Sequence, residues 1–217
     1  MVNRLFALFG NTWLYFLSHQ VEFGGALLDH LKLVGIALGV AMLICLPLGV
    51  WTSRSRFATL TLMNLINGMR VVPSLAILFL VVPYLGLTAT SAAVALTVLA
   101  MPPILINTDA AFRSIDPAVL ESARGMGMTP GQVLWRVEIP LALPVVLTGI
   151  RTAAVEVIAS ATLAAFVGSG GLGIYITRGF AMYDYAILMV GAIPVALLTV
   201  LAESLLNLMQ RAVLPPI

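Results

Sequence analysis

The sequence contains no charged residue between Arg70 and Asp109. A helix needs about 20 mostly apolar residues to cross a bilayer, so this interval is long enough for more than one span. Across the whole chain 61% of the residues are hydrophobic and 9% are charged, whereas soluble domains carry about 25% charged residues. The chain therefore cannot cover a water-facing surface. We expect an all-α integral membrane protein, since helices satisfy their own backbone hydrogen bonds in lipid.

Five transmembrane helices are predicted from the uncharged intervals and the breaks within them. Pro83 to Gly86, followed by a polar stretch, divides the longest interval into two spans. Residues 5–17 are predicted to form an interfacial or re-entrant helix rather than a sixth span. The five spans are predicted at 33–53, about 62–82, about 92–106, 142–167 and 185–202.

The arginines and lysines of the short loops predict the orientation, because cytoplasmic loops carry an excess of both. One side of the membrane receives Arg4, Lys32 and Arg178, and the other receives six arginines. The N-terminus is therefore expected outside and the C-terminus in the cytoplasm. The six arginines expected in the cytoplasm are Arg54, Arg56, Arg113, Arg124, Arg136 and Arg211. The predicted regions are an extracytoplasmic or interfacial segment (1–30), a transmembrane domain (31–206) with a cytoplasmic loop (109–140), and a cytoplasmic tail (207–217).

The predicted cytoplasmic loop has a clear local structure. Asp116 is an N-cap residue and Pro117 occupies the first helical position, so the two together begin a helix. Gly127 suits the left-handed residue that ends this helix. Thr129 to Gln132 matches a capping box, which is predicted to open a second short helix. Two short capped helices are therefore expected on the cytoplasmic side.

The spacing of several residues in this loop resembles the motif of one transporter family. Glu121-Ser122-Ala123, then three residues, Gly127, nine residues and Val137-Glu138-Ile139-Pro140 is similar to the EAA loop of binding-protein-dependent ABC importer permeases. That loop reads Glu-Ala-Ala, three residues, Gly, nine residues, Ile-x-Leu-Pro, so Ser122, Val137 and Ile139 are mild departures. The resemblance implies the type I ABC importer permease fold and a coupling helix that docks in a groove on an ATPase subunit. The coupling site that it implies consists of Glu121, Ser122, Ala123, Gly127, Met128, Val137, Ile139 and Pro140.

Further stretches resemble the osmoprotectant branch of these permeases, which imports glycine betaine, carnitine and choline. The resemblance implies a multi-pass transport subunit of the bacterial cytoplasmic (inner) membrane rather than an enzyme. It also implies an ABC ATPase dimer, a second permease subunit (identical or related) and an extracytoplasmic substrate-binding protein as partners. A methionine-type amino-acid permease is the alternative substrate class, and an ATPase-independent channel or carrier is the alternative mechanism. The matching stretches include Val72–Ala76, Arg124–Thr129, Gly149–Thr152 and Gly168–Gly173.

No catalytic residue, metal site or cofactor is expected in this chain. It has no Gly-x-x-x-x-Gly-Lys-Ser/Thr loop, so ATP and Mg²⁺ are expected in the partner ATPase. Residues 168–173 fit Gly-x-Gly-x-x-Gly, but no strand is predicted before them, so we interpret them as an outer loop or re-entrant turn. The basic residues are not clustered as nucleic-acid binding requires, so no nucleic-acid partner is expected. Membrane lipid is expected to surround the chain.

The candidate translocation path consists of Arg70, Pro73, Ser74, Arg151 and Glu156. Three of these residues, Arg70, Arg151 and Glu156, are charged and lie within the predicted spans. Charges at membrane depth are costly and normally face the bundle interior, a partner or a water-filled path. Arg151 and Glu156 are five residues apart on one helix, so they point about 140° apart and are not expected to pair within it. Glu156 is expected either to attract a cationic head group or to pair with Arg70 or Arg151 of another helix.

Three further features concern packing and the outer face. Gly35 and Gly39 are expected to permit close helix packing in the first span. His19 and His30 are expected outside the spans, in the outer N-terminal region. An aromatic belt at the membrane interface is expected from Tyr84, Tyr175, Tyr183 and Tyr185.

Overall fold

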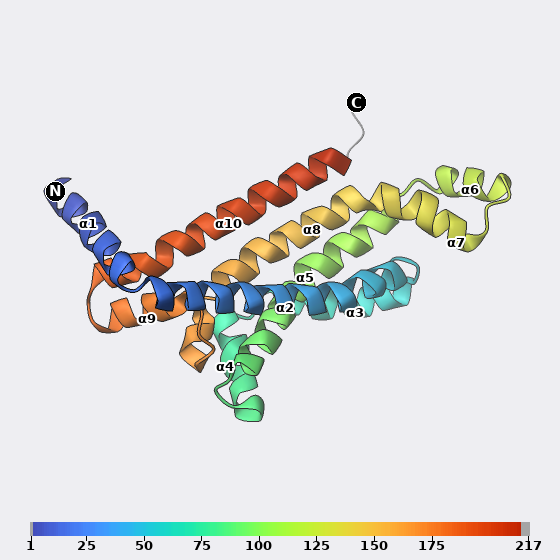
Figure 1. Cartoon of the computed structure of the whole chain (residues 1–217). Helices are drawn as coiled ribbons and strands as arrows, with labels where there is room; N and C mark the ends of the chain where they lie inside the picture. The colour runs from blue at the N-terminus through green and yellow to red at the C-terminus, as the bar shows by residue number, and fades with distance from the viewer. Residues whose placement is uncertain (1, 214–217) are drawn as a thin grey trace.

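The computed structural model describes residues 2–213, and every regular element in that range is helical. The last four residues of the expected cytoplasmic tail lie outside the described range. Helices α6 and α7 lie at one end of an elongated bundle, and α1 and α9 lie near the opposite end (Figure 1). In chain order the elements are α1 (Val2–Ser18), α2 (Gln20–Ser53), α3 (Arg56–Met69), α4 (Ser74–Leu85), α5 (Ala89–Arg113), α6 (Pro117–Gly125), α7 (Pro130–Val133), η1 (Leu134–Glu138), α8 (Ile139–Ser160), η2 (Leu163–Val167), α9 (Gly173–Ala181) and α10 (Tyr185–Val213).

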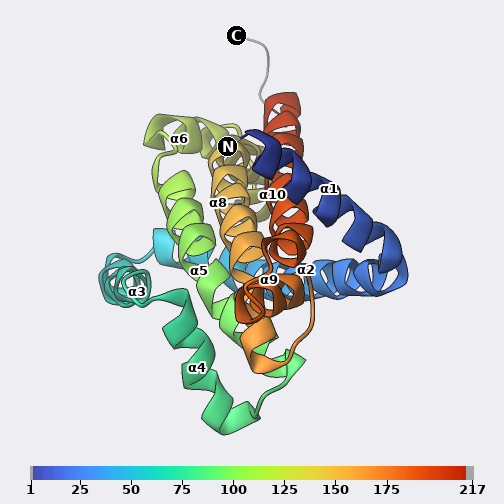
Figure 2. The ribbon, with the colours of Figure 1, turned by 90° about the vertical axis from the view of Figure 1, so that its left-hand side faces the viewer.

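Four continuous helices are long and apolar enough to cross a membrane, namely 20–53, 89–113, 130–160 and 185–212. The pair α3 and α4 supplies a fifth, broken span, in which the two helices meet at 97°. The expected count of about five spans is therefore confirmed, but the prediction that the second span is one continuous helix is wrong. Pro73 explains the break, because it has no backbone N–H and disfavours the helical conformation of the residue before it. Figure 2 shows α3 and α4 at the edge of the bundle, where both contact α5.

The most buried span is α5, which packs against α2 on one side and α8 on the other. The contact with α2 runs along small side chains spaced four residues apart on that helix. Gly49 shows how close the helices are, since a Cβ built there would lie 2.6 Å from the Cβ of Thr108. Small residues allow membrane helices to approach in this way. The buried small residues of α2 are Ala37, Ala41, Cys45 and Gly49.

The expected contact through Gly35 and Gly39 is not made within this chain. Apart from the adjacent residues and backbone of α2 itself, no atom among the described residues lies within 4 Å of a Cβ built at either glycine. These two residues stand two positions out of phase with the stripe that contains Ala37 and Ala41, and two positions on a helix correspond to about 200° of rotation. They therefore face away from α5.

Two predictions for the end of the molecule that is expected to lie outside are wrong. His30 is fully buried inside α2, because that helix begins at Gln20 rather than near Leu33. Tyr175 is 3% exposed and packs with residues of α1, α2 and α10, so it does not belong to an aromatic belt. The other three tyrosines of the predicted belt are exposed.

Candidate functional site

The candidate coupling helix is α6, which projects at one end of the bundle beyond α5 and α8 (Figure 1). Asp116 caps its start by accepting a hydrogen bond from the backbone N–H of Ala118 at 2.9 Å. At its end, the N–H of Gly127 donates to the carbonyl of Arg124 and the N–H of Met128 donates to that of Ala123. This pair of hydrogen bonds is a Schellman motif, which requires a left-handed residue. Gly127 supplies it with a φ of +82°, as predicted from the sequence.

Ala123 and Leu120 attach α6 to the bundle. Ala123 is 2% exposed, and Leu120 packs against a small apolar cluster formed by the end of α5 and the start of α8. An alanine at the contact allows the helix to lie close to its neighbour, as small residues do elsewhere in membrane bundles. The coupling helix is therefore seated on the two spans that flank it in sequence.

The outward face of α6 carries the side chains that a partner would meet. Glu121 and Ser122 are exposed, and the hydroxyl of Ser122 donates to the carbonyl of Ala118 within the helix. Met126 is 76% exposed and Val119 is 40% exposed, so apolar surface lies beside these polar groups. The predicted coupling residues on α6 therefore divide into a buried anchor and an exposed face.

The capping box predicted after Gly127 is present, with Thr129 and Gln132 each accepting a hydrogen bond from the other's backbone N–H. The second short helix predicted there is not separate. The helical path from Pro130 runs through the π-helical turn η1 into α8 and ends at Ser160. The expectation of two short helices is therefore wrong, since the second is the first turn of a span.

Pro140 accounts for the π-helical turn. It has no N–H for the carbonyl four residues earlier, and its ring would clash with that carbonyl in a regular α-helix. The turn Leu134–Glu138 is wider, and Ile139 donates to the carbonyl of Leu134, five residues back. Val137 and Ile139 are half-buried and Pro140 is exposed. The last three predicted coupling residues thus lie at the base of the coupling site rather than on its outward face.

Two ion pairs at this base were not found by sequence reasoning. Arg54, which follows α2, donates from Nη2 to Oε2 of Glu138 in η1 at 2.7 Å. Arg113 at the end of α5 pairs with Asp109 at 2.8 Å, and it also donates to the carbonyl of Thr52 and the hydroxyl of Thr59. The spacing of Asp109 and Arg113 by four residues was a readable signal for a helical pair. Together these contacts tie α2, α3, α5 and η1 beneath the coupling helix.

The residues of the candidate translocation path fall in two places. Arg70, Pro73, Ser74 and Glu156 line one cavity of about 240 Å³ at the break between α3 and α4. Arg151 does not line this cavity, although it lies on the same helix as Glu156. The expected divergence of Arg151 and Glu156 around the helix accounts for this separation.

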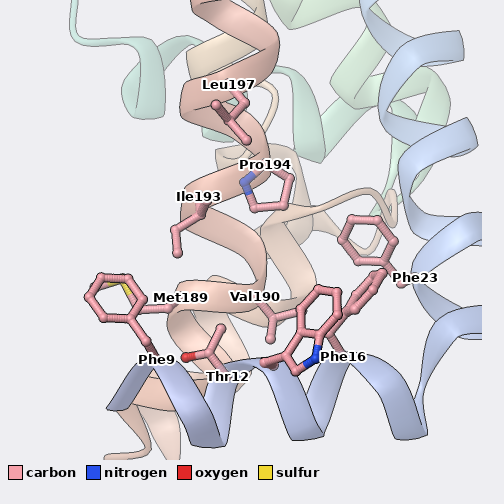
Figure 3. Close-up of a pocket in the computed structure, with 10 residues that line it drawn as sticks. Phe9, Thr12, Phe16, Phe23, Met189, Val190, Ile193, Pro194 and Leu197 are labelled. Atoms are coloured by element: carbon pink, nitrogen blue, oxygen red, sulfur yellow. The ribbon is translucent and has the colours of Figure 1, made fainter. Parts of the chain in front are cut away.

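A larger cavity of about 410 Å³ lies between α1 and α10 and has a different character (Figure 3). Its polar side-chain groups are the indole N–H of Trp13 and the hydroxyl of Thr12, which donates within α1 to the carbonyl of Leu8 and across to the carbonyl of Ala186 in α10. It therefore offers no charged group to a ligand and marks the place where α1 packs against the last span. The remaining lining residues are Phe9, Phe16, Phe23, Met189, Val190, Ile193, Pro194 and Leu197.

Comparison with known proteins identifies the family. The sequence profile of the family described as "Binding-protein-dependent transport system inner membrane component" matches residues 45–215. The chain belongs to this family. It is therefore a permease subunit of an ABC importer, located in the inner membrane, and it is not itself an enzyme. Membership also implies ATPase and substrate-binding partners.

Several members of the binding-protein-dependent permease family are similar over nearly the whole chain. The choline transport system permease protein OpuBB of Bacillus subtilis is 38% identical over 92% of this chain and 95% of its own. The glycine betaine/carnitine/choline transport system permease protein OpuCB of the same organism is also 38% identical, over 88% of this chain and 90% of its own. Among solved structures, the MetNI methionine ABC transporter in inward-facing conformations matches with a TM-score of 0.82. That match has 24% sequence identity, covers 91% of this chain and 99% of the other, and shows the type I permease fold.

Proposed function

We propose that this chain moves quaternary ammonium osmoprotectants, such as glycine betaine, carnitine and choline, across the cytoplasmic membrane by alternating access. The observation that carries the substrate class is the 38% identity, over most of both chains, to permeases named for choline and for glycine betaine, carnitine and choline. The methionine transporter shares the fold at 24% identity. An amino-acid substrate therefore has the weaker support.

The geometry of α6 supports the proposed coupling to an ATPase. Its outward face presents Val119 and Met126 next to Glu121, a mixture suited to a groove on another protein. Its inward face is anchored through Ala123, so a push on α6 would move the attached spans as a rigid body. We expect this partner to be an ATPase dimer that binds ATP and Mg²⁺. We also expect a second permease subunit, identical or related, and an extracytoplasmic binding protein that delivers the substrate.

Site-directed crosslinking tests the coupling role. Met126→Cys places a thiol on the exposed face of α6, and a maleimide–benzophenone reagent attached there should capture the co-expressed ATPase subunit. The native Cys45 is fully buried and should not compete for the reagent. Tyr183→Cys is the matched control, because Tyr183 is 86% exposed and lies between α9 and α10, away from α6. If neither Met126→Cys nor Val119→Cys yields an ATPase adduct in membranes, the coupling role is contradicted.

Uptake by the complete complex in proteoliposomes tests the transport reaction. We expect labelled glycine betaine to accumulate only when ATP and the loaded binding protein are both present. Uptake at the same rate without ATP would instead support a channel or carrier. Saturable uptake of methionine, with none of glycine betaine or choline, would support the amino-acid alternative.

A further inference from the structure

The cavity at the break between α3 and α4 has walls from three spans. The connection from Arg70 to Pro73 forms one side, Val98 to Pro103 of α5 form another, and Glu156 and Ser160 of α8 close it. Transporters commonly place substrate sites where a membrane helix is interrupted, because backbone and side-chain polar groups can face a cavity there. None of its lining residues belongs to α6, α7 or η1, so it is a separate feature from the coupling site.

Two opposite charges line this cavity and attract each other across it, but they do not form an ion pair at contact distance. Arg70 and Glu156 both have exposed side chains, and residues 2–213 provide no hydrogen bond or ion pair to either one. The ion pairs among the side chains that the structure describes join Lys32 to Asp29, Arg54 to Glu138, and Arg113 to Asp109. A charge at membrane depth is costly unless it is paired or faces a water-filled path. The cavity is therefore suited to a ligand that supplies a charge of each sign.

The size and lining of the cavity restrict that ligand further. Its volume of about 240 Å³ is below the range of about 300–1,000 Å³ typical of sites for drug-sized ligands. The polar side chains that line it are those of Arg70, Glu156, Ser74 and Ser160, which supply a guanidinium, a carboxylate and two hydroxyls. No aromatic side chain lines it, so the cation–π contacts that make a tight site for quaternary ammonium are missing. A small zwitterion held weakly by two charges fits these conditions.

We infer that this cavity is a transient site for the zwitterionic substrates, with Glu156 facing the quaternary ammonium and Arg70 pairing with the carboxylate. The inference rests on the proposed function and assigns a site within it. A quaternary ammonium group has no N–H to donate, so its attraction to Glu156 is coulombic. A carboxylate matches the N–H donors of a guanidinium. Glycine betaine and carnitine carry both charges, whereas choline carries only the cation. Arg70 should therefore contribute to binding of the first two substrates and not to binding of choline.

Transport of two substrates by variants of the complete complex tests this assignment. Glu156→Gln should lower uptake of both glycine betaine and choline about tenfold. Arg70→Gln should lower uptake of glycine betaine about tenfold and leave that of choline within about twofold. A tenfold change corresponds to about 1.4 kcal/mol. Glu203→Gln is the matched control, because it neutralises an exposed carboxylate of α10 that does not line the cavity, and both substrates should be imported at wild-type rates.

The double variant Arg70→Gln/Glu156→Gln distinguishes a substrate site from a structural ion pair. If the two charges only neutralise each other, each single change should harm both substrates equally and the double variant should recover, which would overturn the inference. Unchanged uptake of both substrates in both single variants would also overturn it. If the wild-type complex imports neither compound, both the proposed function and the site that depends on it are contradicted. If the wild-type complex imports both compounds and the variants keep the same selectivity, only the assignment of the site is contradicted.

A second measurement does not depend on whether the charge variants fold. Ser74→Cys places a thiol in the cavity, and Cys45 is buried. In the permease–ATPase complex without binding protein, glycine betaine at millimolar concentration should slow labelling of this variant by a small thiol reagent. Sodium chloride at the same concentration should have no such effect. Labelling at the same rate with and without glycine betaine would overturn the inference.

Discussion

At position 127 the left-handed backbone conformation, rather than contact with a neighbouring atom, favours glycine. The φ of Gly127 is +82°, and no described atom lies within 4 Å of a Cβ built there. A larger side chain would therefore meet open space but a strained backbone. Left-handed backbone costs other L-residues about 1–2 kcal/mol, and asparagine tolerates it better than β-branched residues do.

We predict that Gly127→Val lowers ATP-driven uptake by a factor of about 5–30, the change that corresponds to one or two kcal/mol. Gly127→Asn should keep most of the activity, because asparagine adopts the left-handed conformation. Gly131→Ala is a second control, since Gly131 is helical and also faces open space. Immunoblots of the membrane fraction should show equal amounts of all three proteins. Equal activity of the valine and asparagine variants would show that the conformation of this turn does not matter.

At the scale of elements, the Arg54–Glu138 pair joins the end of α2 to the π-helical turn below the coupling helix. The Arg54 side chain is 55% exposed, whereas the Glu138 side chain is 11% exposed. Removing Arg54 leaves an almost buried carboxylate without its partner, which costs more than losing an exposed pair. The Lys32–Asp29 pair offers a comparison, because its side chains are 69% and 55% exposed and its charges are 3.6 Å apart.

We predict that Arg54→Gln destabilises the purified complex more than Glu138→Gln does, since glutamine at 138 can still accept a hydrogen bond. A double-mutant cycle read by thermal unfolding should give a coupling energy of about 0.5–3 kcal/mol. The same cycle on Lys32 and Asp29 should give less than about 1 kcal/mol. Additive effects at Arg54 and Glu138 would indicate that this pair does not hold the two elements together.

Local chemistry explains which elements the sequence predicts. The N-cap Asp116, the capping box and the left-handed Gly127 each act within a few residues, so these caps and α6 could be predicted, whereas the continuation of the second helix into α8 could not. The small stripe of α2 could not, because small residues occupy several faces of that helix and only the contact with α5 selects Ala37 over Gly35.

Long-range contacts explain what the sequence does not predict. Arg54 and Glu138 are 84 positions apart, and no local pattern joins them. Pro73 did provide a signal for the broken span, but the apolar run through it favoured one helix. The sequence grouped Arg70, Pro73, Ser74, Arg151 and Glu156 as a candidate translocation path, which stays a prediction, and the fold places all of these except Arg151 at one cavity.

At the scale of the whole molecule, α6 and the turn between α9 and α10 lie near opposite ends of the bundle (Figure 1). The excess of arginine at the α6 end predicts that this end is cytoplasmic. We predict that a membrane-impermeant maleimide labels Tyr183→Cys in intact cells and labels Met126→Cys only after the cells are opened. Both positions are exposed in the chain alone, so in cells that express it without the ATPase, access alone should decide the result. The reverse pattern would contradict the proposed orientation.

The continuous helical path from Pro130 to Ser160 has a mechanical consequence. Its 31 residues correspond to a rod about 46 Å long at 1.5 Å per residue, which starts beside the coupling helix and ends at Glu156 and Ser160. Each residue of a helix turns the chain by about 100°, so the π-helical turn near the start fixes the direction in which every later side chain of α8 points. Deleting one residue there would therefore turn Glu156 about a quarter of a revolution around the axis and out of the cavity, even though no residue that lines the cavity or the exposed face of α6 would itself be changed.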